Sequence, residues 1–161
     1  MNWYAVTVRP RHEFSAAEAL AARDVVAYVP SYKSRRQWTD RMKTVEWPLI
    51  PGYVFVQFDR GSRTAVLQSN GVTSLVQLGG QPAPIPDLEI ESLRTLLASG
   101  YPLEPVPGLV PGERIRVENG PLAGAVGVFL KRRGADCMAV TVELLGRSVI
   151  ATVNLSSISR E

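Results

Sequence analysis

The stretch Gly52-Tyr53-Val54-Phe55-Val56-Gln57-Phe58 is the clearest β-strand signal in this chain. Strand alternation puts Tyr53 and Phe55 on one face and the valines between and after them on the other. Both faces carry large apolar side chains, and burying either face from water is favourable. We therefore expect one face to pack the core and the other to be covered by a helix or a partner protein.

The segments around this strand alternate between strand and helix patterns. The whole chain has 161 residues, enough for one or two small domains. The order of elements up to residue 100 predicts an α+β fold, an α/β sandwich with helices against a mostly antiparallel sheet. Strands are expected at 3–8, 25–29, 45–50, 53–58 and 72–78, and helices at 12–23, 62–68 and 87–99.

A change in composition follows this first unit. Residues 100–112 contain four prolines, which predicts a stiff, extended spacer. Beyond it, β-branched residues punctuated by glycines predict five short strands in a small β-barrel. We therefore expect a domain at 1–100, a Pro-rich linker at 101–111 and a barrel at 112–161. The spacer predicts that the two domains tumble independently.

The counts of reactive residues exclude several classes of function. With one cysteine, Cys137, and one histidine, His12, the chain cannot form an internal disulfide and is poorly equipped for structural zinc or a catalytic triad. We expect no enzyme activity, metal or cofactor, with Cys137 a packing residue. The first four residues lack the features of a signal peptide, and no apolar run is long enough to span a bilayer, so a cytoplasmic protein is expected.

Positive charge is concentrated in one short segment. Residues 33–43 carry a local charge of +4 in a chain whose net charge is +3. Such a segment favours contact with a nucleic-acid backbone, with Trp38 available to stack on a base. The alternative is a solvated hairpin tip that protects a sheet edge. The basic residues are Lys33, Arg35, Arg36, Arg41 and Lys43.

A glycine-rich stretch, Val117-Glu118-Asn119-Gly120-Pro121-Leu122-Ala123-Gly124-Ala125-Val126-Gly127, lies between two strand patterns. Gly120 suits a tight turn, while Gly124 and Gly127 suit a positive φ or a close backbone approach. A phosphate-binding loop is disfavoured, because no Lys-Ser/Thr pair and no helix follow.

This stretch resembles the KOW motif of SH3-like barrels in NusG and ribosomal proteins. The first unit resembles the NusG N-terminal domain in Trp3-Tyr4 and in the run Pro48-Leu49-Ile50-Pro51-Gly52-Tyr53-Val54-Phe55-Val56. The resemblance covers essentially the whole chain. Its length and the segment 35–41 are similar to the specialised paralogues of the UpxY, LoaP and RfaH type.

The resemblance implies a transcription elongation and antitermination factor that binds RNA polymerase. The implied contacts with the β′ clamp helices use an apolar surface of the N-terminal domain, and those with the β gate loop use a short helix. The same apolar residues are alternatively intradomain core. The implied clamp-helix residues are Tyr53, Phe55, Leu78, Ile90 and Leu93, and the implied gate-loop residues are Arg63 and Thr64.

The resemblance also implies contacts with the non-template DNA strand, or with nascent RNA, from Arg9, Arg11, His12 and Asn70. Thr7 stands where RfaH has an aromatic residue, which argues against RfaH-like sequence recognition. The barrel is implied to bind Rho, a small-subunit ribosomal protein or RNA, and the factor to act as a monomer. The alternative class is a ribosome-associated KOW protein that binds RNA.

Overall fold

The N-terminal half is built on a four-stranded antiparallel sheet. The computed structural model describes residues 1–38, 41–154 and 159–160, with side chains outside 34–44, 60 and 159–160. The strand order is β2-β5-β1-β6. All three pairings are antiparallel, as the sequence predicted. The strands are β1 (Trp3–Val8), β2 (Val26–Tyr28), β5 (Tyr53–Gln57) and β6 (Val72–Leu75).

Each face of this sheet packs a separate apolar cluster. Val54 and Val56 pack with residues of α1 (Glu13–Ala21) and α2 (Arg63–Leu67), which a 3₁₀ turn, η1 (Arg60–Ser62), precedes. Phe55, on the other face, is fully buried in a cluster that includes residues of α3 (Asp87–Ala98). The prediction that both faces of the 53–58 strand are covered is confirmed, and within this chain the second cover is α3.

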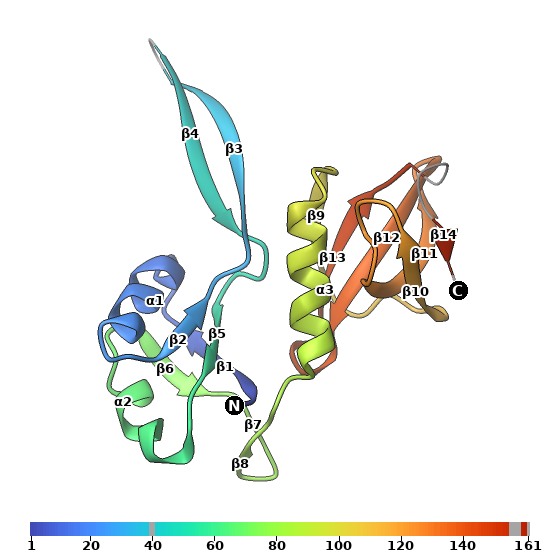
Figure 1. Cartoon of the computed structure of the whole chain (residues 1–161). Coiled ribbons are helices and arrows are strands. Elements are labelled where there is room, and N and C mark those ends of the chain that lie inside the picture. The colour runs from blue at the N-terminus through green and yellow to red at the C-terminus, as the bar shows by residue number, and fades with distance from the viewer. Residues whose placement is uncertain (39–40, 155–158, 161) are drawn as a thin grey trace.

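Two hairpins leave this sheet. The longer one, β3 (Ser31–Trp38) with β4 (Arg41–Pro48), forms a separate two-stranded ribbon that projects from the body of the molecule (Figure 1). The shorter one pairs β7 (Gln77–Leu78) with β8 (Gln81–Pro82). Gly79 and Gly80, both at positive φ, make its two-residue connection, a geometry that glycine adopts without strain.

The C-terminal half is one antiparallel sheet of six strands in the order β14-β10-β11-β12-β13-β9. Among the described residues this sheet has two edges, β14 and β9, and forms no closed barrel, whereas a small five-stranded β-barrel was expected. The strands are β9 (Leu103–Pro107), β10 (Arg114–Asn119), β11 (Val126–Arg132), β12 (Ala135–Val142), β13 (Arg147–Thr152) and β14 (Ser159–Arg160), with a 3₁₀ turn, η2 (Glu143–Leu145), after β12.

The expected Pro-rich linker at 101–111 contains a β-strand in its middle part. β9 pairs with β13 from Leu103 opposite Ala151 to Pro107 opposite Arg147. Prolines are compatible with this placement because β9 is an edge strand, where the missing N–H groups can face away from the ladder. The proline-rich composition therefore marks an edge strand as well as a boundary.

The glycine-rich stretch behaves as its spacing predicted. Gly120 and Gly124 have φ values of 87° and 90°. At Gly127 an added Cβ would lie 2.3 Å from the carbonyl oxygen of Ala139 and 2.8 Å from Cε of Met138. Gly127 is therefore the point where β11 approaches β12 more closely than any side chain permits.

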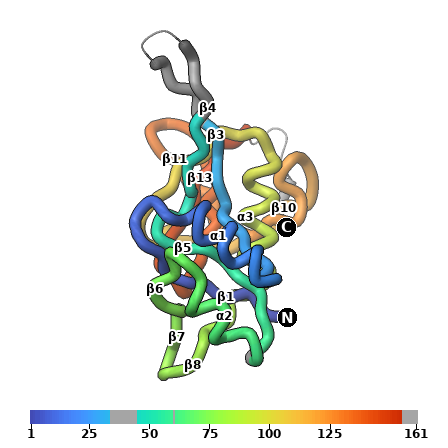
Figure 2. Tube along the Cα trace, turned by 90° about the vertical axis from the view of Figure 1, so that its left-hand side faces the viewer, coloured from blue at the N-terminus to red at the C-terminus, as the bar shows by residue number. Residues whose placement is uncertain are grey.

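Helix α3 lies between the two sheets. Figure 1 shows it flanked by the N-terminal sheet and by β11–β13, and in Figure 2, where the N-terminal half faces the viewer, the C-terminal half lies behind. One apolar cluster contains Trp3 and Phe55 from the first sheet, Leu93 from α3, and Met138 and Val149 from the second sheet. The two halves thus share a core, which contradicts the expectation of two independent bodies.

Candidate functional site

The junction around α3 is held by polar contacts as well as by the shared core. Ser92, 1% exposed, accepts a hydrogen bond from the backbone N–H of Val126 at 3.0 Å. On another side of the helix, the Arg94 guanidinium lies 5.4 Å from the ring centre of Trp3 and 4.7 Å from that of Tyr28. Such cation–π contacts are favourable. α3 is therefore tied to both sheets.

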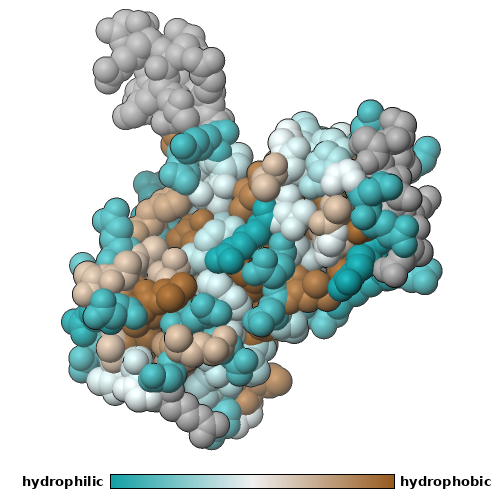
Figure 3. Space-filling model, viewed as in Figure 1, coloured by the Kyte–Doolittle hydropathy of each residue, from teal (hydrophilic) through white to brown (hydrophobic). Residues whose placement is uncertain are grey.

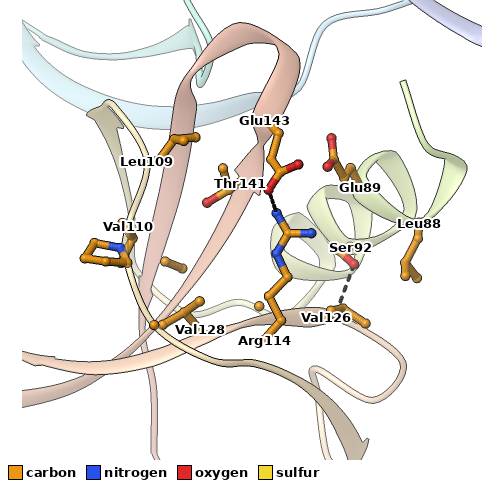
Figure 4. Close-up of a pocket in the computed structure, with 14 residues that line it drawn as sticks. Leu88, Glu89, Ser92, Leu109, Val110, Arg114, Val126, Val128, Thr141 and Glu143 are labelled. Atoms are coloured by element: carbon orange, nitrogen blue, oxygen red, sulfur yellow. Dashed lines mark hydrogen bonds and ion pairs between the residues drawn. The ribbon is translucent and has the colours of Figure 1, made fainter. Parts of the chain in front are cut away.

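A cavity of about 320 Å³ opens where α3 meets the second sheet (Figure 4). Arg114 and Glu143 form an ion pair on its wall. Glu89 faces this pair, and burial raises the pKa of its carboxyl, with the Glu143 N–H and Arg114 acting in the opposite direction. Among the described residues, Oε1 of Glu89 is a buried oxygen with no hydrogen-bond partner. The cavity wall therefore carries a partly buried carboxyl whose charged form is disfavoured by desolvation.

Three of the expected polymerase contacts lie in the interior. Phe55, Ile90 and Leu93 are each 0% exposed. In this structure α3 and the second sheet bury that cluster, as the core alternative expected, and a contact of these three residues with polymerase stays a prediction. Tyr53 is half-buried and packs at the edge of the same cluster.

The remaining expected polymerase contacts gather at one end of the N-terminal sheet. Leu78, on the β7–β8 hairpin, is 72% exposed. Arg63, at the start of α2, lines a cavity with Gln81 and Pro82 of β8. Thr64 is exposed beside it. Figure 1 shows α2, β7 and β8 together at the lower end of the molecule.

The residues expected to contact nucleic acid near the first helix lie together. The N–H of Arg9 donates to the carbonyl of Gly71 at 2.9 Å, and the N–H of His12 donates to the carbonyl of Arg9 at 3.0 Å. Gly71, at φ 92°, brings Asn70 against the start of α1, where its own Cβ would lie 3.2 Å from that of Ala16. Arg9, Arg11, His12 and Asn70 are all exposed.

The basic segment forms the outer part of the β3–β4 hairpin. Lys33 is exposed and lies opposite Glu46 in the strand register. The strands place Arg35 opposite Thr44 and Arg36 opposite Lys43. The side chains of Arg35, Arg36, Trp38, Arg41 and Lys43 are outside the described part of the structure, so their predicted contacts stay predictions.

The surface and interior give no sign of a metal or thiol centre in the described part of the chain. Cys137 is 3% exposed and packs with Ala139 and Ile150, as a packing residue should. No cluster of three metal-binding side chains occurs among the described residues. None of the helices among those residues has the length and apolar character to cross a membrane.

Figure 3 shows apolar patches interrupted by hydrophilic side chains on the face in view.

The fold defines a mixed α/β protein in which a helix-bearing sheet and a second antiparallel sheet share one core. The family model described as transcription termination factor NusG matches residues 1–94. This chain belongs to the NusG family. Its members are transcription factors rather than enzymes, and the chain is a NusG-like transcription termination/antitermination factor.

Relatives and a solved structure agree with this assignment. The chain is 28% identical over 177 residues to transcription termination/antitermination protein NusG of Pseudomonas aeruginosa, covering 99% of this chain and 98% of that protein. It is 32% identical over 124 residues to the NusG of Buchnera aphidicola, covering 71% and 66%. A solved structure on domain interaction in Thermotoga maritima NusG has a TM-score of 0.57 and 22% identity, covering 98% and 96%. That likeness extends over both halves of the fold.

Sequence reasoning missed the residues that join the two halves. Ser92 and Glu89 lie in α3. The packing of this helix was predicted from its apolar residues alone. The role of Ser92 and Glu89 depends on β11 and η2, which lie more than 30 residues further along the chain. The signal available in the sequence was a serine at position 92, on the side of the predicted helix that carries its apolar residues.

Proposed function

We propose that this protein is a specialised NusG paralogue, of the UpxY, LoaP or RfaH type, that binds RNA polymerase in the cytoplasm, suppresses pausing and opposes termination. It acts by binding to polymerase and does not catalyse a reaction. The observation that carries the proposal of a polymerase-binding factor is the family match over residues 1–94, the part of the chain that contains every predicted polymerase contact. The specialised type is supported by the resemblance of the segment 35–41.

The exposed end of the N-terminal sheet supports a first contact with polymerase. Leu78 presents a large apolar side chain at the tip of a short hairpin, where burial against a partner is favourable. Arg63 and Thr64 lie at the same end, on the helix assigned to the β gate loop. Tyr53 lies further along the sheet and is half-buried.

Use of Phe55, Ile90 and Leu93 requires a rearrangement. All three are buried in the cluster that α3 shares with the second sheet. We infer that the clamp helices reach these side chains only after the shared cluster has opened, with the second sheet displaced from α3 and, for Phe55, α3 displaced from the first sheet. Binding through this face therefore competes with the packing of the two halves.

We infer that the C-terminal unit is a KOW-type, SH3-like module that binds a second partner, such as Rho, a small-subunit ribosomal protein or RNA. The glycine geometry at Gly120, Gly124 and Gly127 supports this assignment. We further infer that the exposed residues at the start of α1 and the basic hairpin contact DNA or nascent RNA, since cations supply most sequence-independent nucleic-acid affinity.

The test is retention of bacterial RNA polymerase by the immobilised full-length chain. We expect wild type to retain the core enzyme and Leu78→Ser to weaken binding by about fivefold or more, as loss of an exposed apolar anchor can. Leu109→Ser is the matched control, because Leu109 is 58% exposed on the C-terminal half.

Two outcomes would contradict the proposal. If wild type retains no polymerase but retains ribosomal subunits, the ribosome-associated alternative holds. If polymerase is retained equally by Leu78→Ser and wild type, the hairpin is not the contact. Readthrough of an intrinsic terminator in a reconstituted transcription reaction then measures whether binding produces antitermination.

A further inference from the structure

A further cavity lies away from both the α3 junction and the Leu78 hairpin. Its volume is about 660 Å³, within the range of ligand sites in proteins. The start of α1, the base of the β3–β4 hairpin and Pro105 of β9 all contribute to its wall. It therefore draws on both halves of the chain.

Aromatic and proline side chains make most of the lining. Phe14, Tyr32 and Trp47 are each partly exposed there, and Tyr32 lies directly opposite Trp47 in the hairpin register. Partly exposed aromatic rings offer both apolar area and a negative face to a cation. The lining therefore suits a flat or elongated group that carries positive charge.

The charged side chains at the cavity also favour a positively charged ligand. Among the described lining residues, the carboxylates of Glu13 and Glu46 accompany one cation, Arg11, and Lys33 lies opposite Glu46 in the strand register just outside the lining. Glu13 is 5% exposed and accepts a hydrogen bond from the N–H of Gly52 at 2.9 Å, while Glu46 accepts one from Ser31 Oγ at 2.6 Å. In the described part of the chain, no ion pair joins either carboxylate to a Lys or Arg side chain.

We propose that this cavity binds an arginine side chain presented by a partner protein. A guanidinium stacks on aromatic faces and donates to carboxylates at the same time, which an ammonium does less well. The excess of carboxylates disfavours a phosphate backbone here. The site lies at the base of the β3–β4 hairpin, whose basic residues are in its outer part, and it does not depend on polymerase binding.

The test is an NMR titration of the full-length protein, with the indole N–H signal of Trp47 as the reporter. The probe is the peptide acetyl-Gly-Arg-Gly-amide, and the matched peptides carry lysine or citrulline in place of arginine. Citrulline keeps the shape of arginine but is uncharged. We expect the arginine peptide to shift the Trp47 signal, the lysine peptide to bind more weakly, and the citrulline peptide to bind least.

Protein variants check the charge requirement. Glu46→Gln and Glu13→Gln each remove one negative charge, and glutamine at 13 keeps an acceptor for Gly52. We expect each substitution to weaken binding of the arginine peptide by about threefold to tenfold. The control is Glu91→Gln, on the exposed face of α3, which should leave the affinity unchanged. Equal binding of the citrulline peptide, or unchanged affinity in both variants, would overturn the proposal. So would a stronger shift of Trp47 by a single-stranded oligonucleotide.

Discussion

The Ser92 hydroxyl of α3 accepts a hydrogen bond from the backbone N–H of Val126 in β11, at 3.0 Å. The bond joins a helix of the N-terminal unit to the first residue of a strand in the C-terminal sheet. It lies at the junction where the two halves share a core. Since a buried N–H is costly to leave unpaired, this contact ties the position of α3 to the second sheet.

Replacing Ser92 with Ala should destabilise the protein by about 1–3 kcal/mol, because the part-buried N–H of Val126 would lose its acceptor. The measurement is the free energy of unfolding in urea. Ser15→Ala is the matched control, since Ser15 lies on the exposed surface of α1. Equal effects of the two substitutions would show that the Ser92 bond contributes nothing.

The shared core predicts that the free protein tumbles as one body. Backbone ¹⁵N relaxation should give one rotational correlation time for residues of β5 and of β12. The reason is that one apolar cluster contains residues of both sheets and of α3. The proline-rich spacer alone had predicted two correlation times. Two distinct values would show that the halves separate freely in solution.

Glu89 should make stability depend on pH. Burial raises the pKa of this carboxyl, so the folded state holds its proton to a higher pH than the unfolded state does. Stability should therefore fall as pH rises from the ordinary glutamate range through the raised value. Glu89→Gln should flatten this slope in urea unfolding between acidic and neutral pH.

The matched control for this slope is Glu91→Gln, on the exposed side of the same helix. If Glu89→Gln and wild type show the same pH dependence, burial of Glu89 does not set it.

Gly127→Ala should destabilise the second sheet by about 1–3 kcal/mol or more, because the new Cβ would meet the Ala139 carbonyl oxygen at 2.3 Å. Thermal unfolding measures the loss. Gly61→Ala is the control, since the nearest atom to its new Cβ is Asp59 Oδ1 at 3.4 Å. A melting temperature unchanged by Gly127→Ala would mean that β11 and β12 separate at little cost.

Changing Arg35, Arg36 and Arg41 to Gln should reduce the salt dependence of nucleic-acid binding. If all three neutralise phosphates, the log–log slope on duplex DNA flattens by roughly two to three units. A salt titration of DNA and RNA binding measures this for wild type and the triple variant. An unchanged slope would identify the hairpin as a solvated tip and move attention to Arg9 and Arg11.

Several features of the fold follow from local sequence. The alternation of residues 53–58 specified a strand buried on both faces, and the structure places Val54 and Phe55 in separate clusters. The glycine spacing after Val117 specified turns and a close approach, because only glycine tolerates the φ of Gly120 or the contact at Gly127. The residue types in these short segments were enough to predict a strand covered on both faces and glycines at the turns and the close approach, although not which residues they would meet.

The relation between the two halves was decided only by the tertiary structure. Four prolines at 100–112 indicated a spacer, yet β9 uses two of them at the edge of the second sheet. Ile90 and Leu93 suited a partner surface or a core equally well, and the packing of α3 buried them. Whether an apolar face meets the same chain or another protein depends on contacts between residues far apart in the sequence, which local patterns do not contain.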